Sequence, residues 1–250
     1  MMKRLALVLA ALLLPGTAFA AQPAECLVAE QQLEHVFPLP QVARAIAAKK
    51  LGVLVVGAGS STLPGPNGAQ LAYPVRLQQA LTEVLPGVAV KVATDVKAHR
   101  TAAAMVKTLI AALAAAKPAL VIWQTGTVDA MQAVDPDQFS DTLEQGIVIA
   151  RTAGADVVLV NAQYSPRTES MIALGTYADD MRWVAVQHQV PLFNRFEIMR
   201  VWADLGTFDF TSAKNKLRVA ARVHNCIAWL LADLVTQAVK SGEPQTEGAR

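Results

Sequence analysis

The chain has 250 residues, of which 53% are hydrophobic and 17% charged, and its formal net charge is +2. This composition excludes a disordered or coiled-coil protein, and the length is enough for one domain with a substantial core. The near-neutral charge argues against nucleic acid or an anionic membrane surface as the main partner, since both need clustered basic residues.

The first twenty residues have the order of a secretory signal peptide. Lys3 and Arg4 precede an apolar run at residues 5–14, and the small residues Ala18 and Ala20 mark a cut after Ala20. The run is shorter than the roughly 20 residues that cross a bilayer. The residue directly after the cut is Ala21 and not a cysteine, so we expect no lipoprotein anchor. We therefore predict a periplasmic or secreted protein without a transmembrane anchor after cleavage.

The rest of the chain divides into an N-terminal extension at 21–50, one domain at 51–240 and a polar tail at 241–250. Within the extension we expect a short helix that runs through Lys50. In the domain, short apolar runs alternate with longer amphipathic ones. Strands are expected at 53–56, 88–92, 120–123, 157–160 and 191–193, and helices at 73–85, 101–116, 138–152, 170–189 and 214–239.

This pattern predicts the fold class. Strands that are apolar along their whole length are covered on both faces, and strand-helix-strand units give parallel strands with right-handed crossovers. We expect an α/β protein, a three-layer doubly wound sandwich with a mainly parallel five-stranded sheet. Ligands of such sheets bind at the carboxyl ends of the strands. The loops of interest are residues 57–72, 93–100, 124–137, 161–169 and 205–215.

Two cysteines remain after cleavage, Cys26 and Cys226. In an oxidising compartment an even pair favours a disulfide, which here would attach the extension to the last helix. The alternative is two unrelated buried thiols.

Several blocks of sequence are shared with a known family. Residues 53–73 read VLVVGAGSSTLPGPNGAQLAY, residues 117–127 read KPALVIWQTGT, and further blocks lie at 154–164, 195–202 and 225–228. Together they resemble the SGNH (GDSL-type) hydrolase superfamily, and in particular an exported bacterial branch of it, over about residues 50–235. The resemblance implies the SGNH fold and ester substrates such as acylated glycans or lipids.

The resemblance also implies a serine nucleophile in the turn after the first strand. If Gly57 matches the family glycine, Gly59 stands at the position of the nucleophile and has no hydroxyl. A one-residue insertion in the turn would offer Ser60 instead, with Ser61 as a weaker choice. Alternatively, the hydroxyls of Ser60, Ser61 and Thr62 only cap the turn that follows.

Two oxyanion donors are expected from the family, and both positions are changed. The loop at 94–100 has no glycine, so a backbone N–H would have to come from a residue such as Ala98. The family asparagine after Gly-Thr is Val128, which has no side-chain donor, and losing one such donor raises the barrier by about 3 kcal/mol. Asp129 is adjacent, but its carboxylate would repel an oxyanion.

The family's general base is a histidine in an Asp-x-x-His pair before the last helix. Those positions fall near Asn215 and Arg218, and an arginine stays protonated and cannot accept the serine proton. The nearest upstream acid is Asp209, three residues before Ser212. The chain's histidines are His35, His99, His188 and His224.

Two of these histidines lie near the regions of interest. His224 lies within the last helix, about two turns past the family position, and we expect it to be a residue of a helix face. His99 lies at a strand end, where it could supply a base from an unusual direction, although an exposed loop histidine is the simpler interpretation.

A metal site would need clustered ligands, and the nearest approach is the group Asp129, Asp135, Asp137 and Asp141. We expect Asp137 to cap a helix instead, so we predict no metal. The glycines at 57 and 59 lack the third glycine of a dinucleotide fingerprint, so we predict no nucleotide cofactor and no other cofactor.

The leading hypothesis is a catalytically degenerate SGNH-fold protein that binds an acylated glycan, a lipid ester or a partner enzyme in the cell envelope. The alternative is an active carboxylester hydrolase that uses Ser60 with a relocated base. The predicted pocket is lined by Gly59, Ser60, Ser61, Gln124, Thr127, Asp129, Gln163 and Tyr164.

Overall fold

A five-stranded sheet forms the centre of the protein in a computed structural model that describes residues 23–26, 36–211 and 214–242. All its strands are parallel, in the order β2-β1-β3-β4-β5. This order and direction confirm the predicted fold class. The strands are β1 (Lys50–Gly57), β2 (Ala89–Val96), β3 (Leu120–Gln124), β4 (Asp156–Val160) and β5 (Leu192–Phe193).

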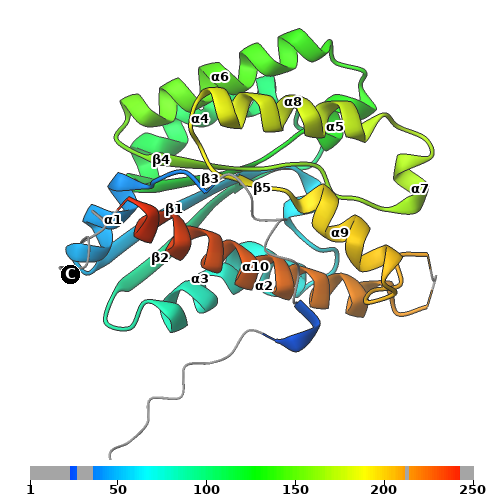
Figure 1. Cartoon of the computed structure of the whole chain (residues 1–250), viewed down its shortest axis with the longest axis horizontal. Coiled ribbons are helices and arrows are strands. Elements are labelled where there is room, and N and C mark those ends of the chain that lie inside the picture. Colours follow the sequence, from blue (N-terminus) through cyan, green and yellow to red (C-terminus); the bar gives the residue numbers. More distant parts are fainter. Residues whose placement is uncertain (1–22, 27–35, 212–213, 243–250) are drawn as a thin grey trace, which may run out of the picture.

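Helices cover both faces of the sheet, which makes three layers (Figure 1). One face carries α4 (Ala102–Ala116), α6 (Pro136–Thr152) and α8 (Leu174–Gln187), and the other carries α1 (Pro40–Ala47), α3 (Tyr73–Val84) and α10 (Lys216–Ser241). The remaining helical segments are η1 (Ala24–Cys26), η3 (Gly59–Ser61), α2 (Gly68–Leu71), α5 (Thr127–Met131), α7 (Pro166–Glu169) and α9 (Arg195–Asp204).

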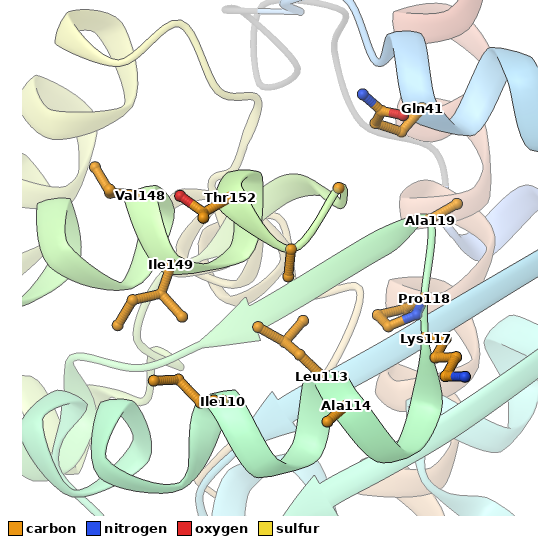
Figure 2. Close-up of a pocket in the computed structure, with 12 residues that line it drawn as sticks. Gln41, Ile110, Leu113, Ala114, Lys117, Pro118, Ala119, Val148, Ile149 and Thr152 are labelled. Carbon is orange, nitrogen blue, oxygen red and sulfur yellow. The ribbon is translucent and has the colours of Figure 1, made fainter.

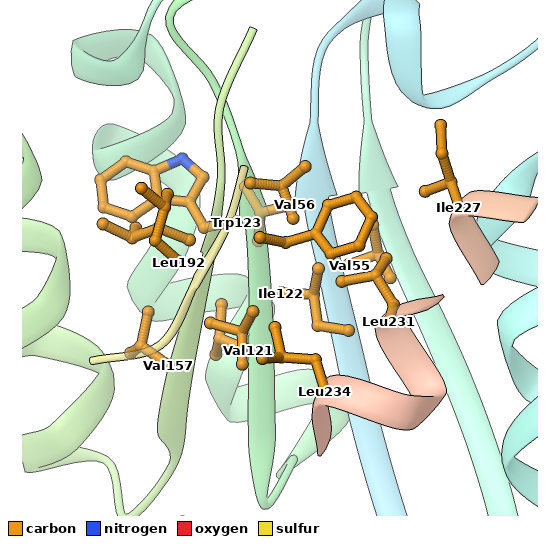
Figure 3. Close-up of a cluster of buried hydrophobic side chains, with 14 of the residues drawn as sticks. Val55, Val56, Val121, Ile122, Trp123, Val157, Leu192, Ile227, Leu231 and Leu234 are labelled. Atoms are coloured by element: carbon orange, nitrogen blue, oxygen red, sulfur yellow. The ribbon is translucent and has the colours of Figure 1, made fainter. Parts of the chain in front are cut away.

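The core forms where α10 lies on the central strands. Ile227, Leu231 and Leu234 of α10 point toward β1 and β3, whose side chains Val55 and Ile122 are buried between the layers (Figure 3). By length and composition α10 could cross a membrane, but 56% of its most apolar stretch is buried inside the protein. It acts here as the core helix that closes one face of the sheet.

Several element boundaries differ from those predicted. The first helix ends at Ala47 and does not run through Lys50, because Lys49 has a left-handed φ of 59° and Lys50 already pairs with Ala89. Strand β2 continues to Val96, since its whole length pairs with β1.

The predicted starts of some helices also differ from the observed ones. The helix predicted at 170–189 begins at Leu174, and α9, which was not predicted, starts directly after β5. Asp135, not Asp137, caps α6, because its Oδ1 accepts hydrogen bonds from the N–H groups of Asp137 and Gln138, both at 3.1 Å.

The predicted disulfide is present between Cys26 and Cys226, whose Cα atoms are 4.9 Å apart. It attaches η1 to α10, and an ion pair between Glu25 and Arg222 lies beside it. The bond joins residues 200 positions apart, and the chain-entropy model assigns about 5 kcal/mol to a loop of that length. The predicted signal peptide at 1–20 and almost all of the tail lie outside the described residues.

A carboxylate holds the start of α1 against the sheet. Oδ2 of Asp156, at the beginning of β4, accepts hydrogen bonds from the N–H groups of Gln41 (2.7 Å) and Val42 (3.0 Å). Burial raises the pKa of Asp156, and these two hydrogen bonds partly offset the rise. A residue inside the sheet therefore replaces the missing cap, since Leu39 at the N-cap position has no side-chain oxygen.

Packing of the central strand against α6 depends on Gly146. A Cβ on this residue would lie 2.2 Å from Cζ3 of Trp123, a fully buried ring of β3. We predict that Gly146→Ala lowers the free energy of unfolding by about 1–3 kcal/mol in urea denaturation, because the ring must shift in a packed core.

Gly175→Ala in α8 is the matched control for this prediction. No atom lies within 4 Å of the added Cβ there, so the variant should be as stable as the wild type or up to about 1 kcal/mol more stable. Equal losses in both variants would contradict the packing argument.

Candidate functional site

The turn after β1 is shaped by a close contact. Gly57 ends β1, and a Cβ there would lie 2.1 Å from Oγ of Ser61, so only glycine lets the Ser61 side chain fold back over the strand end. The one-turn helix η3 follows, with Gly59 exposed, Ser60 half-buried and Ser61 buried. The turn therefore presents Ser60 toward the surface and Ser61 toward the core.

Both serine hydroxyls bind the same amide oxygen. Ser60 Oγ donates to Oε1 of Gln124 at 3.0 Å, and Ser61 Oγ also donates to it. Gln124 ends β3 and is fully buried, and the hydroxyl of Tyr73 pairs with Ser61 Oγ at 3.2 Å. Within the described part of the chain, Ser60 Oγ has no other hydrogen-bond partner. Burial raises the pKa of Tyr73, so its phenol stays neutral.

A buried arginine lies behind the turn. Arg195, the first residue of α9, donates from Nη1 to the backbone oxygen of Ser60 at 3.1 Å and from Nη2 to Oε1 of Gln163 at 3.4 Å. Burial lowers its pKa to about 10, which leaves it charged at neutral pH. The sequence analysis did not select Arg195; its place directly after a strand end was the signal that could have found it.

His224 is the histidine buried closest to this network. Its Nδ1 accepts a hydrogen bond from the backbone N–H of Tyr73 at 3.0 Å. Burial, together with the smaller effects of the charges of Arg195 and Arg76, lowers its pKa to about 3, so the ring is neutral. The residue does lie on a helix face, but on the one that packs inward, and its Nδ1 is engaged with the backbone.

The other histidines do not contact Ser60. His99 is exposed in the turn after β2, with a left-handed φ of 60°, and makes no hydrogen bond to Ser60. His188 ends α8, where its Nε2 lies 3.6 Å from a carboxylate oxygen of Glu144. His35 lies outside the described residues. Among the described histidines, therefore, none is placed to take the Ser60 proton.

Val128 stands at the position of the family's oxyanion asparagine, and its neighbour Asp129 connects two helices. Val128 is half-buried in α5. The adjacent Asp129 is buried, and its two oxygens accept hydrogen bonds from Ala102 N (2.8 Å), Thr125 Oγ1 (3.1 Å) and Gly126 N (3.2 Å). This carboxylate joins α5 to the start of α4 and does not face Ser60.

The side chain of Arg100 attaches the loop after β2 to the sheet. Arg100 pairs with Asp95 at 2.9 Å and donates to the backbone oxygen of Gly57 at 3.2 Å. Ala98 comes near Gly59, where an added Cβ would lie 3.9 Å from it. The loop thus lies beside the serine turn.

The predicted pocket residues separate into two groups. Ser60, Ser61, Gln124 and Gln163 meet around the turn, and Gly59 is exposed beside it. Thr127 and Asp129 are buried in α5, and Tyr164 is buried edge-on against the ring of Phe196. Asn215 and Arg218, at the family's Asp and His positions, are exposed at the start of α10.

A small cavity of about 220 Å³ adjoins the serine turn. Ser61, Thr62 and Thr94 contribute hydroxyls to it, and the apolar part of its lining consists of Ala69, Ala72, Pro74, Val75 and Val96. The cavity lies at the carboxyl ends of the strands, as expected for this fold class.

A larger groove of about 750 Å³ lies at the opposite end of the sheet (Figure 2). It runs between α4 and α6, where Ile110 and Val148 are exposed, and includes Ala119 just before β3. None of the predicted site residues lines it. Among the described residues, no group of three or more His, Cys, Asp or Glu side chains could hold a metal ion.

Comparison with known proteins was made for sequence and for structure. The model of the Non-GDSL lipase-like family matches residues 25–241. TesA is similar in structure, with TM-score 0.56, 24% identity, 73% of this chain and 99% of that chain covered. A catalytic mutant of Axe2, an acetylxylan esterase from Geobacillus stearothermophilus, has TM-score 0.58 and 15% identity over 76% of this chain and 94% of that chain.

A lipase/acylhydrolase from Enterococcus faecalis is also similar, with TM-score 0.56 and 19% identity over 76% of this chain and 96% of that chain. A search of the curated proteins found no match. The structural likenesses concern the fold.

The low pKa of His224 predicts how stability depends on pH. Below pH 6.5 the unfolded chain protonates this histidine while the folded protein does not until about pH 3, so stability falls as the pH falls through this window. We expect the drop in unfolding free energy between pH 6.5 and 4.5 to be about 2 kcal/mol larger in the wild type than in His224→Gln, measured by urea denaturation.

His188→Gln is the control, because His188 is only partly buried. It should keep the pH dependence of the wild type. If His224→Gln keeps it as well, the neutral buried state assigned to His224 is wrong.

Proposed function

Since this chain belongs to the Non-GDSL lipase-like family and has the fold of SGNH/GDSL hydrolases, we propose that it binds an acylated glycan or a lipid ester in the cell envelope without hydrolysing it. The bound group enters at the strand ends, beside Ser60 and Ser61. The predicted signal peptide supports the envelope location.

The hydrogen bond from Ser60 to Gln124 is the observation on which the loss of hydrolysis rests. Ester hydrolysis by a serine needs a base that takes the hydroxyl proton during attack. An amide oxygen accepts hydrogen bonds but does not titrate, so Gln124 holds the hydroxyl without activating it. Val128 also supplies no oxyanion donor, which costs about 3 kcal/mol of transition-state stabilisation.

The cavity beside Ser61 supports binding of an acyl group. Its 220 Å³ suits a short chain, which would contact the apolar side chains of Ala69, Val75 and Val96. Donors for the ester oxygens come from the hydroxyls of Thr62 and Thr94, because the Ser61 hydroxyl already donates to Gln124. The printed names of similar structures, an acetylxylan esterase and a lipase/acylhydrolase, point to the same class of ligand. A small ester suits this cavity better than a partner enzyme does.

The loss of hydrolysis is tested with p-nitrophenyl acetate and a fluorophosphonate probe on the purified protein. We expect no turnover above the buffer rate and no covalent labelling, because Ser60 lacks a base. Stoichiometric labelling that disappears in Ser60→Ala but persists in Ser170→Ala would establish the alternative, an active carboxylester hydrolase with a relocated base.

The binding site is tested by blocking the cavity. Val75 is 40% exposed on α3 and lines the cavity, so Val75→Trp should fill its mouth and weaken the binding of 6-O-octanoyl glucose about tenfold or more, measured by calorimetry. Val148→Trp, at an exposed valine of α6 away from the cavity, should leave the affinity unchanged. Equal affinities in all three proteins would contradict this site.

A further inference from the structure

Arg195 is a buried cation without an acidic partner in the described part of the chain. Its side chain is 1% exposed, and no carboxylate lies within ion-pair distance of it among the described residues. Its two contacts, to the Ser60 carbonyl and the Gln163 amide, are with neutral oxygens. Its Nε has no hydrogen-bond partner in the same part of the structure. No acidic group in the described part of the structure therefore neutralises the charge of Arg195.

Such an arrangement is costly for folding alone. Removing an unpaired cation from water costs several kcal/mol, and a guanidinium has five N–H donors, of which two are used here. The other buried arginine of this region, Arg100, pairs with Asp95 in the usual way. A buried unpaired guanidinium needs a further reason, and recognition of an anion is the task for which its planar fork is suited.

The position of Arg195 agrees with a ligand contact. It stands directly after β5, at the edge of the sheet where the ligands of parallel α/β folds bind. It is also the first residue of α9, so the positive end of the helix dipole adds to its charge. The guanidinium lies directly behind Ser60, the residue that the turn presents at the surface.

Gln163 is the side chain that contacts Nη2 of Arg195. This side chain is half-buried, and its contact with Nη2 is long, at 3.4 Å. Rotation of the Gln163 amide away from Arg195 would leave Nη2 free to donate to another acceptor. A negatively charged oxygen would then replace a neutral one, with a shorter and stronger hydrogen bond.

We propose that the ester ligand carries an anionic oxygen group, a phosphate or a carboxylate, and that Arg195 recognises this group next to Ser60. The inference rests on the proposed ester binding and adds a determinant of specificity to it. Phosphorylated lipids and acyl chains that end in a carboxylate carry such a group, whereas neutral glycan esters lack it and should bind more weakly.

The test compares amphiphiles that share one chain and differ in charge: octyl phosphate, monooctyl succinate and the neutral octyl β-glucoside. Calorimetry at low salt measures their affinities. We expect the wild type to prefer at least one anion over the glucoside by about tenfold or more, and the better anion identifies the group. Arg195→Gln should abolish this preference while the affinity for the glucoside changes little.

Arg76→Gln is the matched control. Arg76 also lies near His224, but it donates to Asn225 at 3.1 Å and to the Leu71 carbonyl, away from Ser60. The Arg76→Gln variant loses one positive charge, as Arg195→Gln does, and should keep the preference for the anion. Equal losses in both arginine variants would show a general charge effect and overturn the proposal.

A measurement on the wild type covers the case in which Arg195→Gln does not fold. In protein labelled with ¹⁵N-arginine, the buried Nε–H of Arg195 should shift on addition of octyl phosphate or monooctyl succinate, but not of the glucoside. Equal binding of the neutral and charged amphiphiles without this shift overturns the anion proposal and leaves ester binding intact. Failure of all three to bind overturns both.

Discussion

The carboxyl ends of β1 and β3 meet at one edge of the sheet, and there the amide of Gln124 holds the turn that follows β1. Parallel pairing puts Val56 opposite Trp123, so Gly57 and Gln124 end their strands together. Because Gly57 has no side chain, Ser61 can reach back and share the Gln124 oxygen with Ser60. This single acceptor determines the direction of both hydroxyls. It also gives the Ser60 hydroxyl an acceptor that does not titrate, which is the basis of the proposed loss of hydrolysis.

The charges around the turn form a consistent pattern. Burial and, to a smaller extent, the charges of Arg195 and Arg76 disfavour protonation of His224, which therefore remains a neutral acceptor for the Tyr73 backbone. The acids close to the strand ends are used elsewhere: Asp129 binds backbone groups of neighbouring elements, and Asp95 pairs with Arg100. The edge of the sheet is thus left with a positive charge beside hydroxyl groups, which suits binding of an anion better than removal of a proton.

Several interactions connect the N-terminal part of the chain to the domain. The disulfide attaches Cys26 to α10, and Asp156 of β4 binds the first N–H groups of α1. Both α10 and β4 are buried elements of the core. The part of the predicted extension that the structure describes is therefore integrated with the domain, and its unfolding should be coupled to that of the sheet.

The amino-acid sequence by itself determined the layers and the strands, because apolar runs such as 120–123 and the spacing of the helices depend on local patterns that any α/β sheet must satisfy. The strand-end rule also identified Ser60 and Gln124, since parallel strands bring their ends together whatever their order in the chain. The tertiary structure alone decided that both serines bind one amide oxygen, that Asp129 faces inward, and that Arg195 lies unpaired behind Ser60. These contacts depend on how α5, α9 and α10 pack on the sheet. They join residues that are 27 to 135 positions apart, and such contacts leave no periodic signal in the sequence.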